Sequence, residues 1–371
     1  MSNAARATQV DAEYMRRALA LAARGWGQTA PNPMVGAVVV AADVVVGEGY
    51  HARYGESHAE VVALRAAGDA ARGATLYVTL EPCAHFGKTP PCVDAIVDAG
   101  IARVVAAARD PSDIARGGVE RLRASGIAVD LGSERHRALE LNAPFFNAHA
   151  SARPWVTLKL AVSADWRIAD PSGLHRWITG VDSRHEVHRL RANSDAIAVG
   201  IGTVLADDPS LTVRDAPAPR VAPRRVVFDS SLRAPFDSVL VRTAREIETI
   251  LIARDDPPGP RRDALEAVGV RIIGASNLGG ALASLRALGI RSLFVEGGAR
   301  LAGSMLAADL VDRLVIFQSP TELGDTALGA FDFAPQGFAG ALASTRVVEE
   351  GSFGPDRMTV YALHEVPCSP D

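Results

Sequence analysis

Three residues with the chemistry of metal ligands, His58, Cys83 and Cys92, occur in the first third of the chain. Zinc favours imidazole and thiolate ligands, and a catalytic zinc site keeps only three protein ligands so that a fourth position stays open. Glu60 follows His58 by two residues and can carry a proton for water at such a site. The pattern therefore predicts a catalytic zinc centre in which Glu60 is the general acid and base.

Two alternatives to this catalytic site stay open. A closed structural zinc site would need a fourth ligand, which His85 or His51 can supply. The candidate residues can also have unrelated roles, as a helix-capping histidine, two buried thiols and a surface glutamate. The spacing departs from the Pro-Cys-x-x-Cys form of zinc nucleobase deaminases, because eight residues separate Cys83 from Cys92.

The elements that must position these residues alternate between helix and strand, first over residues 14–107 and again from residue 155. Hydrophobic spacing and turn residues predict helices at 14–24, 59–67, 92–99, 183–191 and 300–308. They predict strands at 35–40, 44–49, 75–80, 102–107, 155–161, 196–200, 226–229, 250–252, 292–296, 313–317 and 358–363. This order is typical of α/β folds, and we expect two domains at 1–148 and 153–366.

Length and composition limit the class of protein. The 371 residues suggest about two to three domains, and a net charge of −4 offers no general attraction to nucleic acid or to anionic membranes. Three cysteines indicate a reducing compartment, and with no signal peptide or long apolar run we expect a cytoplasmic protein. Only two of the 39 cationic residues are lysine, Lys88 and Lys159, so each is a candidate for a specific role.

The first half resembles the deaminase half of the bifunctional riboflavin-biosynthesis deaminase–reductases, the RibD family. The resemblance rests on Asn32-Pro33, GEGYH at 47–51, His58-Ala59-Glu60 and EPCAHFGKTPPC at 81–92, whose cysteine spacing distinguishes this family from cytidine and tRNA-adenosine deaminases. It implies a cytidine-deaminase-like α/β/α domain. It also implies that Asn32, His51 and Lys88 bind the pyrimidine substrate and its phosphate.

The second half contains Glu296-Gly297-Gly298 between a predicted strand and a predicted helix, where free N–H groups can bind phosphate. By itself this turn is only moderate evidence for a nucleotide site. The segments LKLA at 158–161, TVLADDP at 203–209, LTVR at 211–214 and EGGARLAGS at 296–304 resemble the family's reductase half, which implies a dihydrofolate-reductase-like α/β domain that uses NADPH. The implied substrate-binding residues are Lys159, His175, Arg191, Leu211, Arg214 and Glu296, and the implied cofactor-binding residues are Ala161, Trp177, Thr203, Asp207, Ser230, Gly297, Gly298, Ala299, Arg300, Leu301, Ala302, Gly303 and Ser304.

Two positions depart from the family pattern. Trp166 follows Asp165 where the family usually has glycine, and His175 stands where a small hydroxyl residue is more common. The first departure affects a tight turn near the expected nicotinamide, and the second weakens the substrate role of His175.

The resemblance implies two reactions on pyrimidine ribosyl phosphates. The first is zinc-dependent deamination of 2,5-diamino-6-(5-phosphoribosylamino)pyrimidin-4-one, and the second is NADPH-dependent reduction of 5-amino-6-(5-phosphoribosylamino)uracil to the ribityl product. We expect a homo-oligomer that binds neither nucleic acid nor membrane. The rival functions are a nucleoside or tRNA-base deaminase fused to an inactive domain, and a non-catalytic module that zinc stabilises.

Overall fold

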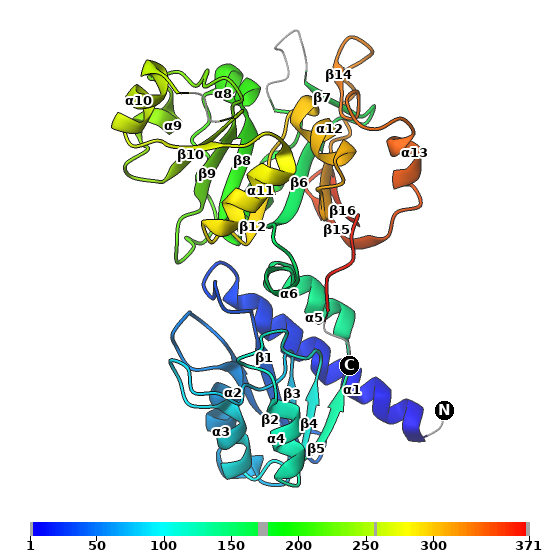
Figure 1. Cartoon of the computed structure of the whole chain (residues 1–371). Coiled ribbons are helices and arrows are strands. Elements are labelled where there is room, and N and C mark those ends of the chain that lie inside the picture. The colour runs from blue at the N-terminus through cyan, green and yellow to red at the C-terminus, as the bar shows by residue number, and fades with distance from the viewer. Residues whose placement is uncertain (1–2, 170–176, 256–257, 369–371) are drawn as a thin grey trace. The chain divides into compact units, whose positions relative to one another are not determined.

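The chain forms two compact units, each with its own sheet and core. The structure, a computed structural model, describes residues 3–169, 177–255 and 258–368. Unit 1 comprises Met1–Ala150 with Val366–Asp371, and unit 2 comprises Ser151–Glu365 (Figure 1). Over the described residues, no helix has the length and apolar character needed to cross a membrane.

Unit 1 is built on a five-stranded sheet of order β2-β1-β3-β4-β5, in which β3, β4 and β5 are parallel and β1 is antiparallel to both of its neighbours. Its strands are β1 (Gly36–Ala41), β2 (Val44–Tyr50), β3 (Thr75–Val78), β4 (Arg103–Ala106) and β5 (Ala128–Leu131). Its helices are α1 (Asn3–Ala22), α2 (Ala59–Ala67), α3 (Cys92–Asp98), α4 (Gly118–Ala124), α5 (Arg135–Leu141) and α6 (Ala143–Ala150), with 3-10 turns η1 (Ala23–Gly25) and η2 (Gly68–Ala71).

Glycines let helices approach both faces of this sheet closely. A Cβ at Gly36 would lie 2.0 Å from the Ala18 carbonyl oxygen of α1. A Cβ at Gly49, which pairs with Ala37, would lie 2.5 Å from the Ala59 carbonyl oxygen of α2. Since successive residues of a strand point to opposite faces, α1 and α2 cover opposite faces of the sheet. The start of α2 is therefore held against β2, which fixes the place of His58.

Unit 2 is built on a nine-stranded sheet of order β11-β10-β9-β8-β12-β6-β13-β16-β15, parallel from β11 to β13 and antiparallel at β16 and β15. The strands of this sheet are β6 (Trp155–Val162), β8 (Ala196–Gly200), β9 (Arg224–Phe228), β10 (Thr249–Ala253), β11 (Arg271–Gly274), β12 (Ser292–Val295), β13 (Arg313–Gln318), β15 (Val347–Phe353) and β16 (Asp356–Ala362). Two further strands, β7 (Arg167–Ala169) and β14 (Leu328–Gly329), pair with each other in a separate two-stranded sheet. The helices are α7 (Val181–Ala192), α8 (Ile201–Asp207), α9 (Val239–Arg242), α10 (Pro260–Ala267), α11 (Leu278–Ala287), α12 (Ala299–Ala307) and α13 (Phe338–Leu342).

Alternate side chains of the unit 2 strands enter different cores. Leu293 and Val295 of β12 pack with α11 and α12, whereas Phe294 packs with Val187 of α7. In the same way, Ile197 of β8 packs with residues of α8, α9 and α10. Helices thus cover both faces of the sheet, as Figure 1 shows, and the predicted α/β class is confirmed.

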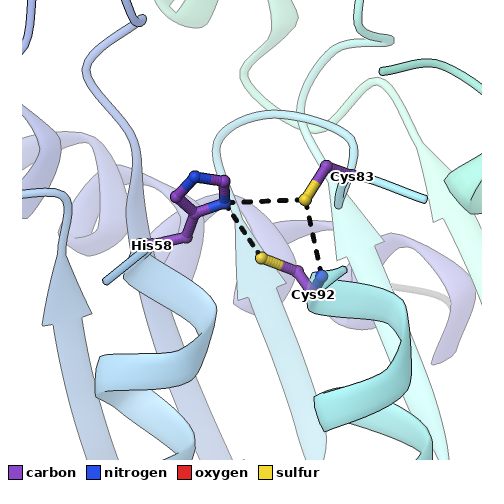
Figure 2. Close-up of side chains that lie close together, drawn as sticks. All are labelled: His58, Cys83 and Cys92. Atoms are coloured by element: carbon purple, nitrogen blue, oxygen red, sulfur yellow. Dashed lines mark hydrogen bonds between the residues drawn. The ribbon is translucent and has the colours of Figure 1, made fainter. Parts of the chain in front are cut away.

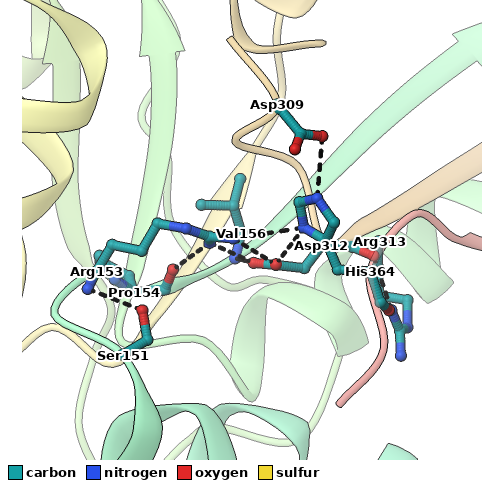
Figure 3. A network of polar contacts seen from close by, with 8 residues as sticks. All are labelled: Ser151, Arg153, Pro154, Val156, Asp309, Asp312, Arg313 and His364. Carbon is teal, nitrogen blue, oxygen red and sulfur yellow. Dashed lines mark hydrogen bonds and ion pairs between the residues drawn. The ribbon is translucent and has the colours of Figure 1, made fainter. Parts of the chain in front are cut away.

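A buried carboxylate joins the first and last strands of unit 2 (Figure 3). Asp312 accepts two hydrogen bonds of 2.7 Å from the Arg153 guanidinium and a third from the Val156 N–H. His364, just after β16, places its Nδ1 2.9 Å from the same carboxylate and its Nε2 3.0 Å from Asp309. The network therefore anchors both chain segments by which unit 2 begins and ends.

The predicted long elements are present, with ends shifted by a few residues; the largest change is α1, which begins at Asn3 and ends at Ala22 rather than spanning 14–24. Within 108–154 and 232–290 the prediction found β10 and missed the other short elements, including α4, β5, α5, α10 and α11. Most of these contain ten residues or fewer and mix polar with apolar positions, so packing rather than hydrophobic periodicity decides their conformation.

Replacing Gly49 by alanine tests the close approach of α2 to β2. The added Cβ would lie 2.5 Å from both Ala59 O and Ala63 N, so we expect a loss of roughly 1–3 kcal/mol in the free energy of unfolding. Urea denaturation followed by circular dichroism measures the loss. Gly340→Ala is the matched control, because its Cβ would have open space and we expect no loss there. Equal stability of the two variants would contradict this account.

Candidate active sites

The three predicted metal ligands come from separate segments of unit 1. His58 is the residue directly before α2, and Glu60 lies in the first turn of that helix. Cys83 follows β3, and Cys92 is the first residue of α3. The fold therefore brings the start of α2, with His58, next to Cys83 and Cys92, which flank the 84–91 loop.

The ligand atoms of these residues converge (Figure 2). His58 Nδ1 lies 3.1 Å from Cys92 Sγ and 3.5 Å from Cys83 Sγ, and the Cys92 N–H donates to Cys83 Sγ at 3.4 Å. One ligand atom from each residue lies within 4.8 Å of the others. Two sulfurs and one imidazole nitrogen at this spacing fit a zinc ion.

The two thiols, Cys83 and Cys92, differ in how readily they ionise. A hydrogen bond from Cys92 and contacts with His58 lower the pKa of Cys83 to about 4, against the opposing effect of burial. The same hydrogen bond, together with burial, raises the pKa of Cys92. The pair therefore gives up one proton easily and the second with difficulty, because two close thiolates repel each other. A divalent cation would remove this repulsion, which agrees with the donor set.

Glu60 is buried in the protein interior. Its residue surface is only 3% exposed, and burial raises the pKa of its carboxyl group. A raised pKa near a reacting water suits a group that must both accept and release a proton. The group of candidate metal ligands found among the described residues is His58, Cys83 and Cys92, without Glu60.

His51 does not serve as a fourth ligand in this arrangement. Its Nδ1 lies 3.2 Å from the Ser57 carbonyl oxygen, and its Nε2 lies 3.3 Å from Asn32 Nδ2. Both ring nitrogens are therefore engaged within the protein. His85 also stays outside the ligand group found among residues 3–169, although its Nδ1 is buried without a hydrogen-bond partner. The open three-ligand site is thus favoured over the closed one.

Glu81 supports the segment that carries Cys83, and sequence reasoning gave it no role. Its buried carboxylate accepts hydrogen bonds from the backbone N–H groups of Asp110, Gly117 and Val119 at 3.0–3.2 Å. A charged residue at the end of an apolar strand, directly before Pro82-Cys83, was the available signal. Lys88, by contrast, is exposed in the 84–91 loop with its Nζ 4.2 Å above the Tyr54 ring.

In unit 2, three predicted substrate residues form one charged cluster. Glu296 accepts hydrogen bonds from Arg191 Nε and from Arg191 Nη2, the latter at 3.0 Å, and Lys159 Nζ lies 3.8 Å from Glu296 Oε2. The three side chains are only 12–16% exposed. Burial opposes ionisation of Glu296, yet the charges of Arg191 and Lys159 lower its pKa to about 2. Burial lowers the pKa of Lys159, and Glu296 partly offsets this effect.

Strand register explains why Lys159 and Glu296 meet. Val295 of β12 pairs with Leu158 of β6, so the next residue of each strand lies side by side. Arg191 comes from α7, the helix that precedes the neighbouring strand β8, and it also donates to the Thr212 carbonyl oxygen at 2.9 Å.

The other predicted substrate residues differ in their surroundings. The Arg214 N–H donates to His188 Nδ1 at 3.0 Å, which links it to the helix that carries Arg191. The Leu211 side chain is buried in the core at a backbone φ of +47°, so only its backbone can face a ligand. His175 lies outside the described residues.

The predicted cofactor residues gather partly at the carboxyl ends of parallel strands. Thr203 lies in α8, and a Cβ at Gly298 would lie 4.0 Å from its Oγ1, so the starts of α8 and α12 are adjacent. Ala161 lies on β6 and Ser230 follows β9. Of the predicted α12 residues, Ala302 is in the core, and Gly303 is needed for packing because its Cβ would lie 2.2 Å from the Phe333 carbonyl oxygen. The other predicted residues are Asp207 at the end of α8, Gly297 before α12, Ala299, Arg300, Leu301 and Ser304 in α12, and the exposed Trp177.

Trp166 occupies a turn that glycine would adopt more easily. Its φ is +62°, in the left-handed region, and its ring packs 5.8 Å from the Phe331 ring. The aromatic contact offsets part of the backbone cost of a side chain in this conformation.

Replacing Glu296 by glutamine tests the charged cluster. The change leaves two largely buried cations without a carboxylate, so we expect a loss of roughly 3 kcal/mol in the free energy of unfolding at pH 7. Because the pKa of Glu296 is lowered in the folded state, its stabilisation is present above pH 4.5 and is lost as pH falls toward 2. Urea denaturation at pH 7 measures the loss. Glu350→Gln, in a half-exposed pair with Arg357, is the control and should cost under about 1 kcal/mol; equal losses would contradict the prediction.

Two protein families match separate parts of the chain. The family described as "Cytidine and deoxycytidylate deaminase zinc-binding region" matches residues 8–108, and the family described as "RibD C-terminal domain" matches residues 154–349. The first match contains His58, Glu60, Cys83 and Cys92, and the second contains the Lys159 cluster.

Individual relatives resemble nearly the whole chain. The riboflavin biosynthesis proteins RibD of Aquifex aeolicus and Escherichia coli are 45% and 43% identical to it, over 85% and 86% of this chain and 89% and 90% of theirs. The structure of Acinetobacter baumannii RibD superposes with a TM-score of 0.80 at 36% identity, and that of a Thermotoga maritima diaminohydroxyphosphoribosylaminopyrimidine deaminase/5-amino-6-(5-phosphoribosylamino)uracil reductase with 0.82 at 32%, each covering 96% of this chain and 99% of its own. The chain therefore belongs to the RibD family of riboflavin biosynthesis, with a zinc-binding deaminase domain followed by a reductase domain.

Proposed function

We propose that unit 1 deaminates 2,5-diamino-6-(5-phosphoribosylamino)pyrimidin-4-one. Unit 2 then reduces the product, 5-amino-6-(5-phosphoribosylamino)uracil, to its ribityl form. The convergence of His58, Cys83 and Cys92 beside the buried Glu60 is the observation that carries the first assignment. His58, Cys83 and Cys92 would hold zinc, which supplies the Lewis acidity that makes water a nucleophile near neutral pH.

Deamination replaces the C2 amino group by oxygen from water and releases ammonia. Glu60 accepts a proton from the attacking water and delivers it to the leaving nitrogen, which its raised pKa favours. Asn32, oriented by His51, faces the pyrimidine, and Lys88 pairs with the phosphate from its exposed loop. Both are proposed substrate contacts, and His51 is proposed to complete the pyrimidine pocket.

In unit 2 the reaction adds a hydride to C1′ of the ribosyl group and opens the sugar, and NADPH is the cofactor that supplies this hydride. Lys159, held by Glu296 at the centre of the sheet, is proposed to orient the sugar. Arg191 and Arg214 can pair with the substrate phosphate by their guanidinium groups. Backbone near Leu211 and the side chain of His175 complete the proposed substrate set.

The cofactor is proposed to lie over the adjacent starts of α8 and α12, where free N–H groups suit phosphate. The proposed contacts are Ala161, Trp177, Thr203, Asp207, Ser230, Gly297, Gly298, Ala299, Arg300, Leu301, Ala302, Gly303 and Ser304. The core packing of Ala302 and Gly303 means that they shape this surface through the backbone. Reduced thiols at Cys83 and Cys92 suit a cytoplasmic location, and we also propose a homo-oligomer that binds neither nucleic acid nor membrane.

The central experiment supplies the diaminopyrimidine phosphate to the purified zinc-loaded protein, with and without NADPH. We expect the deaminated uracil without NADPH and the ribityl product with it, each identified by mass. A nucleoside or tRNA-base deaminase with an inactive second unit would give no ribityl product, and a non-catalytic module would give neither.

Replacing Glu60 by glutamine separates catalysis from metal binding. We expect the variant to retain zinc, because Glu60 is not a ligand, and to lose deamination by at least about 100-fold, because the proton carrier is removed. Zinc is measured by elemental analysis and deamination by product mass. Reduction of supplied uracil substrate is the internal control and should be unchanged. Deamination at the wild-type rate would refute the role of Glu60.

The two lysines offer a reciprocal test of the two sites. Lys159→Ala is expected to abolish NADPH-dependent reduction and spare deamination, whereas Lys88→Ala is expected to weaken deamination and spare reduction. The reason is that each lysine lies in a different unit with its own chemistry. Steady-state rates of both reactions in both variants measure the effects. Loss of both activities in either variant would contradict the assignment of two separate sites.

A further inference from the structure

The two ring nitrogens of His58 face different partners. Nδ1 lies 3.1 Å and 3.5 Å from the two cysteine sulfurs, which makes it the nitrogen on the metal side (Figure 2). Nε2 lies 3.4 Å from the hydroxyl oxygen of Thr89. Thr89 belongs to the eight-residue loop between Cys83 and Cys92, in which the sequence had pointed only to Lys88 and His85 as candidate site residues.

We propose that Thr89 is a positioning residue for the metal ligand His58. Its hydroxyl oxygen accepts a hydrogen bond from the Nε2–H of the imidazole and so holds the ring with its Nδ1 lone pair directed toward the cysteines. The inference rests on the proposed zinc site and adds a residue that prepares one of the ligands.

The tautomer of His58 gives this contact its importance. A neutral imidazole carries one N–H, and only the other nitrogen can bind a metal. Metal-binding histidines nearly always donate their second N–H to a neighbouring acceptor, which fixes both the tautomer and the ring orientation. The hydroxyl of Thr89 is a suitable acceptor at the required place.

Among the contacts of His58, the one that can fix the orientation of its ring comes from a side chain of the 84–91 loop. His58 precedes the first turn of α2, with extended backbone angles, so the helix itself does not fix its ring. The His51 ring packs against it edge-on at 5.5 Å, but the nitrogens of His51 already contact Ser57 and Asn32. His51 thus restricts the ring by packing, whereas Thr89 contacts its nitrogen.

The loop is built to hold Thr89 in place relative to Cys92. The Gly87 N–H donates to the Thr89 carbonyl oxygen at 3.1 Å, and Pro90 and Pro91 lead directly into α3. The two proline rings restrict φ, and they also limit the backbone of Thr89 before them. The long spacing between the cysteines thus leaves room for a hydrogen-bond acceptor for His58, in a loop whose backbone is restricted by this hydrogen bond and the two prolines.

Thr89→Val tests the proposal because it removes the hydroxyl and keeps the β-branched shape. We expect its zinc dissociation constant to rise by about 10- to 100-fold, measured by competition with a zinc chelator of known affinity. Thr89→Ser restores the hydroxyl and should bind zinc within about threefold of wild type. Thr326→Val, at an exposed position of unit 2, is the matched control and should leave zinc affinity unchanged.

The outcomes distinguish this proposal from others. Wild-type zinc affinity in Thr89→Val would overturn it, including the case in which only the KM for the pyrimidine rises, which would make Thr89 a substrate contact. Thermal unfolding of the zinc-free proteins checks that the variant folds, and failure of Thr89→Ser to restore affinity would also overturn the proposal. If the wild-type protein bound no zinc, the proposed deaminase function itself would fail instead.

Discussion

Parallel strand pairing is the constraint on which both candidate sites depend. In unit 2, pairing of Val295 with Leu158 places Glu296 beside Lys159, and the parallel direction leaves both near the carboxyl ends of their strands. In unit 1, β3 and β4 run parallel, so the segments that follow them meet at one edge and Glu81 can bind the backbone of Asp110. Residues far apart in sequence are thereby gathered where loops and helix starts can complete a site.

The two candidate sites differ in how their buried charges are compensated. The charge of Glu296 is compensated by Arg191 and Lys159 before any ligand arrives, and the two cations together exceed the single carboxylate by one positive charge. The Cys83 and Cys92 pair has no such balance, because one thiol ionises readily and the other resists. A preformed ion cluster suits orientation of a substrate, whereas an incomplete anionic set suits capture of a cation.

Supporting contacts are as specific as the ligands themselves. Glu81 binds three backbone N–H groups next to Cys83, and glycines let α2 lie against β2 so that His58 reaches the site. Thr89 contacts the far nitrogen of the same histidine. Each contact restricts a different degree of freedom: the loop path, the helix position and the ring orientation.

The sequence by itself determined the α/β class, the long helices and strands, the ligand triad with Glu60 and the family, because ligand types and hydrophobic periodicity are local properties of the chain. The contacts of Thr89 and His188 were not predictable, since they form only after loops and helices pack, and the sequence offered only a weak signal for Glu81. The short helices such as α4 and α5 were missed for the same reason. Only the tertiary structure decided that His51 is engaged by Ser57 and Asn32 rather than open to a metal, because hydrogen-bond partners depend on distance in space and not along the chain.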